Sequence, residues 1–331
     1  MKNILFVHGI PDHRKARVLR VNPLTGDISY NYNGGCELNK HLTETAWKRQ
    51  SVVLDTRNLK MTFQGTHCIV NQIAEADLCQ VTLTHLSRLL EQHADIPVFN
   101  HPQHVLKTRR DEVYHLLKDI DGITAPKTIR VSPQSPEEVL KQVEANISYP
   151  AIIKACGEHN GRAMLRLNGP EDMMALHALP LDGRDYYLIE YVDVSQGGVY
   201  HKHRIALVQG KSFPRHSCYF DQWQINYDKA SRGFMKKHSQ YAHQERTFLK
   251  YYYQNHEADL AERFEQIYQR IPLDLVGLDC AMLNGELVIF ELNANMQLFD
   301  ILKEDLKHLK QPVQRIREAV TRTIHQKAHH A

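Results

Sequence analysis

Two apolar runs joined at Asn284-Gly285 constrain the fold of this chain more than any other segment. LVGLDCAML precedes the dipeptide, and LVIFELNAN follows it after a single residue. Asn-Gly favours the tight turn between antiparallel strands, so the segment predicts a β-hairpin beside a core. Asp279 precedes Gly285 by six residues and Glu291 follows it by six. This near-symmetric register predicts that the two carboxylates lie close together.

The polar side chains of this hairpin suit a divalent cation. Glu291 and Asn293 are two residues apart, so a strand points both to one face. Mg²⁺ prefers carboxylate and amide oxygens and takes phosphate oxygens as further ligands. Asp279, Glu291 and Asn293 therefore form a candidate Mg²⁺ site. The alternative is that they are solvent-facing residues of an amphipathic hairpin.

Two earlier segments carry residues suited to a nucleotide. Lys154 ends the apolar run YPAIIK, and a loop containing Gly161 follows, so the lysine can reach a phosphate that backbone N–H groups cover. No GxxxxGK[ST] motif occurs, and a structural strand-end lysine is the alternative. LIEYVD is interpreted as the end of a strand and the residues after it. Backbone groups there can hydrogen-bond an adenine edge, and a nearby carboxylate can bind the ribose hydroxyls. The alternative is an ordinary edge strand.

Three regions differ in their patterns. Residues 1–125 predict an α/β layer, with strands in ILFVHG, SVVLDT, HCIVNQ and IPVFN and helices over about 78–93 and 107–119. Residues 126–190 predict a small α+β lobe whose helix begins at a Ser135 cap. Residues 191–331 predict an antiparallel meander, a polar-aromatic insert, the hairpin and final amphipathic helices.

Composition limits the function classes. The chain has 331 residues, which suits two or three packed lobes, and its formal net charge of +3 does not indicate a nucleic-acid protein. A mean hydropathy of -0.47 and short apolar runs argue against a membrane span. The start MKNILFVHG is interpreted as a strand and not a signal peptide, so we expect a cytoplasmic protein. Six scattered cysteines indicate reduced thiols.

The order of these segments resembles the ATP-grasp superfamily from about Asn100 to Asn295. The similar parts are the PAIIK lysine with its glycine loop, LIEYVD, the arginine-bearing strand HKHRIALVQG and the D…E-x-N set. The resemblance implies an ATP-grasp fold, in which an N-terminal α/β domain precedes two lobes that clamp the nucleotide. Within that superfamily the similarity is to carboxylate–amine ligases with an ATP-binding domain like that of glutathione synthetase.

The resemblance also implies roles for individual residues. The implied ATP-binding residues are Lys154 and Gly161 at the phosphates, Glu190, Tyr191 and Val192 at the adenine, and Asp193 at the ribose. The implied Mg²⁺ ligands are Asp279, Glu291 and Asn293. Arg204 and Arg215 would face the transferred phosphoryl group or the substrate carboxylate.

The chain departs from the family pattern at two places. Members usually have a further lysine before the small lobe, where this chain offers Lys107, Arg109 or Arg110, and spacing favours Arg110. The loop GEHNGR is poor in glycine, and Arg162 would compensate electrostatically.

The insert from Cys218 to about Tyr241 combines aromatic residues with a basic cluster that includes Lys236 and Lys237. Such a loop suits a polar or peptide-like anionic substrate. The alternative is a helical flap that only packs.

The resemblance implies an ATP- and Mg²⁺-dependent ligase that joins a carboxylate to an amine, or less often a thiol, through an acyl phosphate. The alternatives are a small-molecule kinase on the same fold and a catalytically silent ATP-binding or scaffold protein. Amino acids and peptides remain open as substrates. A homodimer is the default expectation for such an enzyme.

Overall fold

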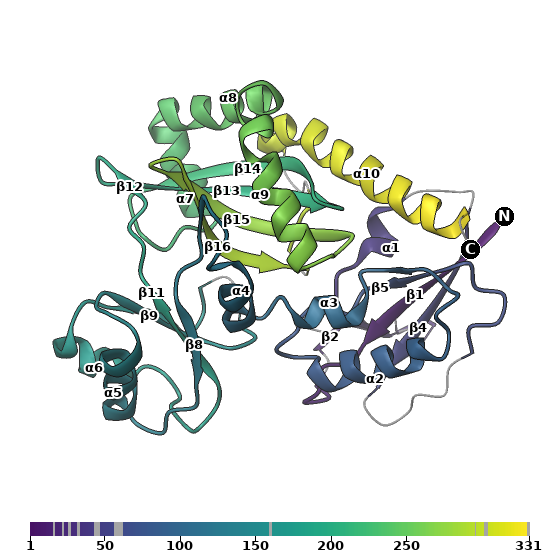
Figure 1. The fold of residues 1–331 in the computed structure, drawn as a ribbon, viewed down its shortest axis with the longest axis horizontal. Coiled ribbons are helices and arrows are strands. Elements are labelled where there is room, and N and C mark those ends of the chain that lie inside the picture. Colours follow the sequence, from purple (N-terminus) through teal and green to yellow (C-terminus); the bar gives the residue numbers. More distant parts are fainter. Residues whose placement is uncertain are drawn as a thin grey trace.

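A computed structural model shows three sheet-based bodies along the chain (Figure 1). It describes residues 1–331 except 16, 22, 26–27, 32–33, 43–46, 56–61, 159–160, 295, 301–303 and 330–331. Four residues of the segments discussed above lie outside the described residues: Thr56, His159, Asn160 and Asn295.

The N-terminal body is a parallel four-stranded sheet in the order β4-β1-β5-β6. Its strands are β1 (Lys2–Gly9), β4 (Trp47–Leu54), β5 (Cys68–Asn71) and β6 (Val98–Phe99). The predicted α/β layer is confirmed, because apolar runs form strands and helix α2 (Gln80–Glu91) covers the sheet. The sequence did not predict the small hairpin of β2 (Arg17–Val21) and β3 (Ile28–Asn31) or the short α1 (Leu38–His41).

The helix predicted over about 107–119 is present as α4 (Arg110–Leu117), which begins three residues later and ends two residues earlier than predicted. The short α3 (Pro102–Leu106), which was not predicted, precedes it. Between them Arg109 is extended, with φ -60° and ψ 141°. Asp111 and Glu112 in the first turn of α4 stabilise a new helix N-terminus at this point.

The small lobe is an antiparallel four-stranded sheet in the order β10-β9-β11-β8. Its elements are β8 (Thr128–Val131), α5 (Pro136–Asn146), β9 (Ala151–Ala155), β10 (Met164–Leu167), the 3-10 turn η1 (Pro170–Asp172), α6 (Met173–Leu176) and β11 (Tyr186–Glu190). Ser135 caps α5 as predicted, because its hydroxyl accepts a hydrogen bond from the backbone N–H of Glu138 at 3.3 Å.

The large lobe has a six-stranded sheet. Its strands are β12 (Ser195–Gln196), β13 (Val199–Val208), β14 (Lys211–Phe220), β15 (Leu275–Leu283), β16 (Glu286–Asn293) and β7 (Ile123–Thr124). Its helices are α7 (Lys229–Lys237), α8 (Ser239–Asn255), α9 (Glu257–Arg270), the 3-10 turn η2 (Glu304–Leu309) and α10 (Lys310–His329). The predicted Asn284-Gly285 turn is confirmed, with φ of 52° and 85° at its two residues.

The N-terminal sheet and the large sheet share one hydrophobic core. Phe6 and Val70 of the first belong to the same buried cluster as Leu275 of the second and Ile316 of α10. Asn100 joins the two sheets by polar contacts, since its side-chain N–H donates to the carbonyl of Leu275 at 2.8 Å. These two bodies are therefore one packing unit.

The guanidinium of Arg130 links the small lobe to the N-terminal body and to α4. Arg130 of β8 lies 2.6 Å from a carboxylate oxygen of Asp77 in the N-terminal body, 3.2 Å from Asp111 of α4 and 3.0 Å from Asp185. The hydroxyl of Tyr187 also donates to Asp77 at 2.7 Å. This group of residues is called the Arg130 network below.

Among the described helices, none combines the length and the apolar character that crossing a bilayer requires.

Candidate active site

A cavity of about 770 Å³ lies where the three bodies meet. Its walls come from β9 and β11 of the small lobe, from β13, β15 and β16 of the large sheet, and from residues 34–38 of the N-terminal body. Such a junction between lobes is a usual place for a ligand site.

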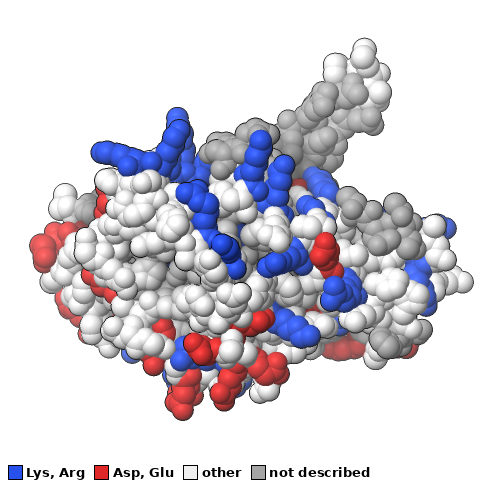
Figure 2. All heavy atoms as spheres, turned by 90° about the horizontal axis from the view of Figure 1, so that it is seen from above, with Lys and Arg blue, Asp and Glu red and all other residues white. Residues whose placement is uncertain are grey.

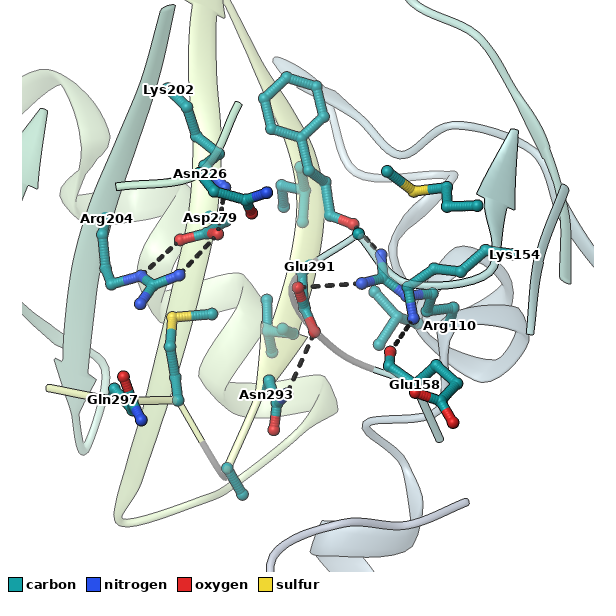
Figure 3. Close-up of a pocket in the computed structure, with 18 of the residues that line it drawn as sticks. Arg110, Lys154, Glu158, Lys202, Arg204, Asn226, Asp279, Glu291, Asn293 and Gln297 are labelled. Atoms are coloured by element: carbon teal, nitrogen blue, oxygen red, sulfur yellow. Dashed lines mark hydrogen bonds and ion pairs between the residues drawn. The ribbon is translucent and has the colours of Figure 1, made fainter. Parts of the chain in front are cut away.

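The hairpin brings the three candidate metal ligands to this cavity (Figure 3). Asp279 and Glu291 are direct cross-strand partners, as the symmetric register predicted. The register shifts between Asp279 and Cys280, which indicates an extra residue in β16. The side-chain N–H of Asn293 donates to Glu291 at 3.1 Å.

Both carboxylates contact neighbouring cations directly. Asp279, whose side chain is only 3% exposed, contacts Arg204 Nε and Lys202 Nζ, each at 2.8 Å. Glu291 contacts Arg110 Nη2 at 2.9 Å. Arg110, which spacing favoured among three candidates, therefore lies in the cavity as predicted.

These contacts keep both carboxylates ionised. Burial raises the pKa of Glu291, but the charges of Arg110 and Lys154 outweigh it and lower the pKa to about 2. The pKa of Asp279 lies well below its usual range, because Arg204 and Lys202 outweigh the effect of burial. Two ionised oxygen ligands are therefore present at neutral pH.

Lys154 lies in the cavity at the end of β9, as its position after YPAIIK predicted. Its ammonium group donates to the backbone carbonyl of Glu158, within the loop that leads to Gly161. Burial, followed by the charge of Arg110, lowers the pKa of Lys154. Together with Arg110, Lys202 and Arg204, Lys154 brings four cationic side chains to the cavity wall near Asp279 and Glu291, and such groups can bind a phosphate chain.

The predicted adenine segment also lines the cavity. Glu190, Tyr191 and Val192 are among its lining residues, which also include the apolar Ile152, Ile289 and Phe290. Asp193 is not among the lining residues. Its carboxylate instead accepts a hydrogen bond from the backbone N–H of Ser195 at 2.8 Å and so shapes the turn into β12.

Arg215 is placed differently from Arg204. It is buried and does not line the cavity, because the β13–β14 register shifts next to Arg204. Its Nε donates to the carbonyl of Leu298 and its Nη2 to that of Asp300, each at 2.7 Å. Arg215 therefore holds the loop 296–300, which forms one wall of the cavity.

Sequence reasoning missed several polar residues of the cavity, among them Lys202, Asn226 and Gln297 (Figure 3). Lys202 could have been found, because it lies two residues before Arg204 on one strand and so shares its face. Asn226 and Gln297 reach the cavity from loops of different regions, which local patterns do not place.

The insert after Cys218 contributes both a wall and a helix. Residues 223–226, called the strap below, line the cavity, and α7 follows them. Gln224 donates to the carbonyl of Gly161 at 2.9 Å and so ties the strap to the small lobe. The guanidinium of Arg166 lies 5.8 Å from the ring centroid of Trp223 and 5.0 Å from that of Tyr191. The insert thus forms part of the cavity wall and a helix, and its role toward a substrate stays a prediction.

This position makes Trp223 a reporter of the cavity. We expect the binding of a non-hydrolysable ATP analogue to change the emission of Trp223, since the strap lines the cavity beside Tyr191. Trp47, the other tryptophan, is 5% exposed and lies in the core. The signal should therefore vanish in Trp223→Phe and persist in Trp47→Phe, as titrations monitored by fluorescence would show. A response that depends on Trp47 alone would contradict this expectation.

Comparison with solved structures identifies the fold. D-alanine–D-alanine ligase from Bacillus anthracis, complexed with ATP, matches 99% of this chain and 97% of its own, with a TM-score of 0.55 and 12% identity. A RimK domain protein ATP-grasp from Sphaerobacter thermophilus matches 96% of this chain and 99% of its own, with a TM-score of 0.52 and 12% identity.

Carboxyaminoimidazole ribonucleotide synthase from Aspergillus clavatus, also complexed with ATP, matches 89% of this chain and 71% of its own, with a TM-score of 0.50 and 12% identity. No protein-family model and no curated protein matches the sequence. The structural similarities show that the chain has the ATP-grasp fold, as the sequence resemblance predicted.

Proposed function

We propose that this protein is an ATP- and Mg²⁺-dependent ligase that joins a carboxylate to an amine through an acyl phosphate. The observation that carries the proposal is the pairing of Asp279 with Glu291 in a cavity that also holds Lys154, Lys202 and Arg204. Two structural neighbours with this fold are described as ligases or synthases complexed with ATP. Both observations support ATP as the nucleotide and ligation as the class of reaction.

The residues present fit a magnesium ion. Among the described residues, no group of three or more His, Cys, Asp and Glu side chains is arranged for a metal. The set at the hairpin is instead two carboxylates and a carboxamide, Asp279, Glu291 and Asn293, which suits a cation that completes its shell with phosphate oxygens. When bound there, Mg²⁺ would supply charge neutralisation at the phosphates.

In the proposed reaction, a carboxylate oxygen of the substrate attacks the γ-phosphorus of ATP, the bond to the bridging oxygen breaks, and ADP leaves. The amine nitrogen then attacks the carbonyl carbon of the acyl phosphate, its bond to phosphate oxygen breaks, and the nitrogen loses a proton. Lys154 and Arg110, which line the cavity, would hold the phosphates, and Arg204 would neutralise the charge that develops on oxygen.

The test begins with nucleotide binding. We expect a non-hydrolysable ATP analogue to raise the melting temperature more with Mg²⁺ than without it. A screen of carboxylates against amines should then reveal phosphate release that needs both substrates. Phosphate transfer to a hydroxyl would favour a kinase, and binding without substrate-dependent hydrolysis would favour a silent ATP-binding protein. No stabilisation by any nucleotide would refute the proposal.

A further inference from the structure

The segment that follows the strap is rich in lysine and arginine. From Lys229 to Asn255, through α7 and α8, it has six lysine and arginine residues and a single acidic residue, Glu245. Glu245 is buried, and its carboxylate lies 3.0 Å from His308. The negative charge of Glu245 therefore lies inside the protein and not on its surface. The exposed cations are Lys229, Lys236, Lys237, Arg246 and Lys250, which together are called the α7–α8 basic surface.

Charges of the two signs lie apart on this side of the molecule. Figure 2 views the protein from above, where lysines and arginines gather along one long edge and acidic residues gather along the opposite edge. Because the net charge of the whole chain is only +3, the basic edge reflects an uneven distribution and not a generally basic protein. Such a surface attracts a negatively charged partner to one place.

The α7–α8 basic surface begins at the wall of the cavity. Asn226 of the strap lies next to Lys202 and Asp279 (Figure 3), and Lys229 follows it by three residues. Asp228 caps α7, since its carboxylate accepts hydrogen bonds from the backbone N–H groups of Ala230 at 2.9 Å and Ser231 at 3.1 Å. The cap fixes the start of the helix beside the strap.

Two carboxamide side chains in the cavity suit a peptide. Asn226 points into the cavity from the strap, and Gln297 lies near Arg204 on the loop that Arg215 holds. A carboxamide carries both a donor and an acceptor, as a peptide group does. Arg204 is held by Asp279 through its Nε and Nη2, at 2.8 and 2.9 Å, and is the cation that a substrate carboxylate would approach.

We propose that the α7–α8 basic surface docks an acidic peptide whose carboxylate enters the cavity past Asn226 toward Arg204. This inference rests on the proposed function, since it identifies the carboxylate substrate as part of a carboxylate-rich chain. An acidic peptide supplies both the charge that docks and the group that reacts, whereas a nucleic acid supplies no carboxylate. The axis of α7 from Lys229 to Lys237 spans about 12 Å, the length of about four extended peptide residues.

The test measures peptide binding directly. A short fluorescein-labelled oligoglutamate should bind the protein at low ionic strength, as measured by fluorescence anisotropy, and should dissociate as salt is added. The double variant Lys236→Glu/Lys237→Glu should bind it about tenfold more weakly. The matched control is Lys48→Glu/Lys141→Glu, which makes the same change in net charge at exposed positions on β4 and α5. It should bind nearly as the wild type does.

Three results would overturn this proposal. The first is no binding of oligoglutamate by the wild type, and the second is equal weakening in both double variants. The third is equal or tighter binding of an oligothymidylate of the same charge, which would indicate a nucleic-acid partner. Thermal shift with the ATP analogue distinguishes a failure of this proposal from a failure of the proposed function. Lys236 and Lys237 do not line the cavity, so their replacement should leave nucleotide binding unchanged.

Discussion

Glu291→Gln is expected to reduce turnover by about 100-fold or more and to remove the extra thermal stabilisation that Mg²⁺ gives with an ATP analogue. Glutamine keeps the shape of the side chain but lacks the charge that would hold the metal. It also leaves Arg110 without the carboxylate that lies 2.9 Å away in the native structure. Binding of the analogue without Mg²⁺ should persist or strengthen, since a negative charge that repels the phosphates is gone.

The control for this variant lies on the same strand. Glu286→Gln makes the same substitution at an exposed position at the start of β16, away from the cavity. Thermal shift, calorimetry and phosphate release should not distinguish it from the wild type. If Glu291→Gln kept full turnover at saturating ATP, Glu291 would not be a metal ligand. A loss of analogue binding in the absence of Mg²⁺ would instead indicate that the substitution damages the site as a whole.

Arg130→Met is expected to lower the free energy of unfolding by about 2–3 kcal/mol. The substitution removes the cation shared by Asp77, Asp111 and Asp185. The Asp77 side chain is 9% exposed, so water does little to replace the lost partner. Arg130 itself is 24% exposed, which places the expected loss below that of a fully buried ion pair. Chemical denaturation measures the change.

An exposed arginine of the same lobe provides the control. Arg184 pairs with Asp182, and both side chains are more than half exposed. Arg184→Met should therefore change the free energy of unfolding by no more than about 0.5 kcal/mol. Arg130→Lys should recover only part of the loss, because one ammonium group lacks the planar geometry that reaches three carboxylates. An Arg130→Met protein as stable as the wild type would show that the Arg130 network makes no net contribution to the free energy of unfolding.

Local patterns predicted the parts of the site that lie on single elements. The Asn-Gly turn predicts the hairpin and brings Asp279 and Glu291 close together, although the turn register alone would pair Asp279 with Phe290 and the extra residue in β16 makes Glu291 the partner. The apolar run before Lys154 likewise places that lysine at the end of a buried strand. The hairpin and the position of Lys154 rest on turn chemistry and apolar patterning, which depend on neighbouring residues alone.

Features set by tertiary contacts escaped prediction. The register shift beside Arg204 turns Arg215 toward a loop and away from the cavity. Pro214 in KSFPRH is typical of a bulge, but it does not predict which way Arg215 turns. Arg109, extended at the start of α4, makes that helix begin three residues later than predicted. The approach of Gln224 to Gly161 joins two loops distant in sequence. Each depends on packing between elements and not on local propensity.

The core shared by the N-terminal sheet and α10 has a consequence for how this chain folds. Phe6 lies on the first strand and packs in one cluster with Ile316, Val320 and Ile324 of the last helix. During synthesis the apolar side chains of the first strands that pack against α10 stay exposed until α10 has left the ribosome. The small lobe closes its own sheet within residues 128–190. We therefore expect it to fold early, and the two outer bodies to fold together and slowly, as long-range contacts require.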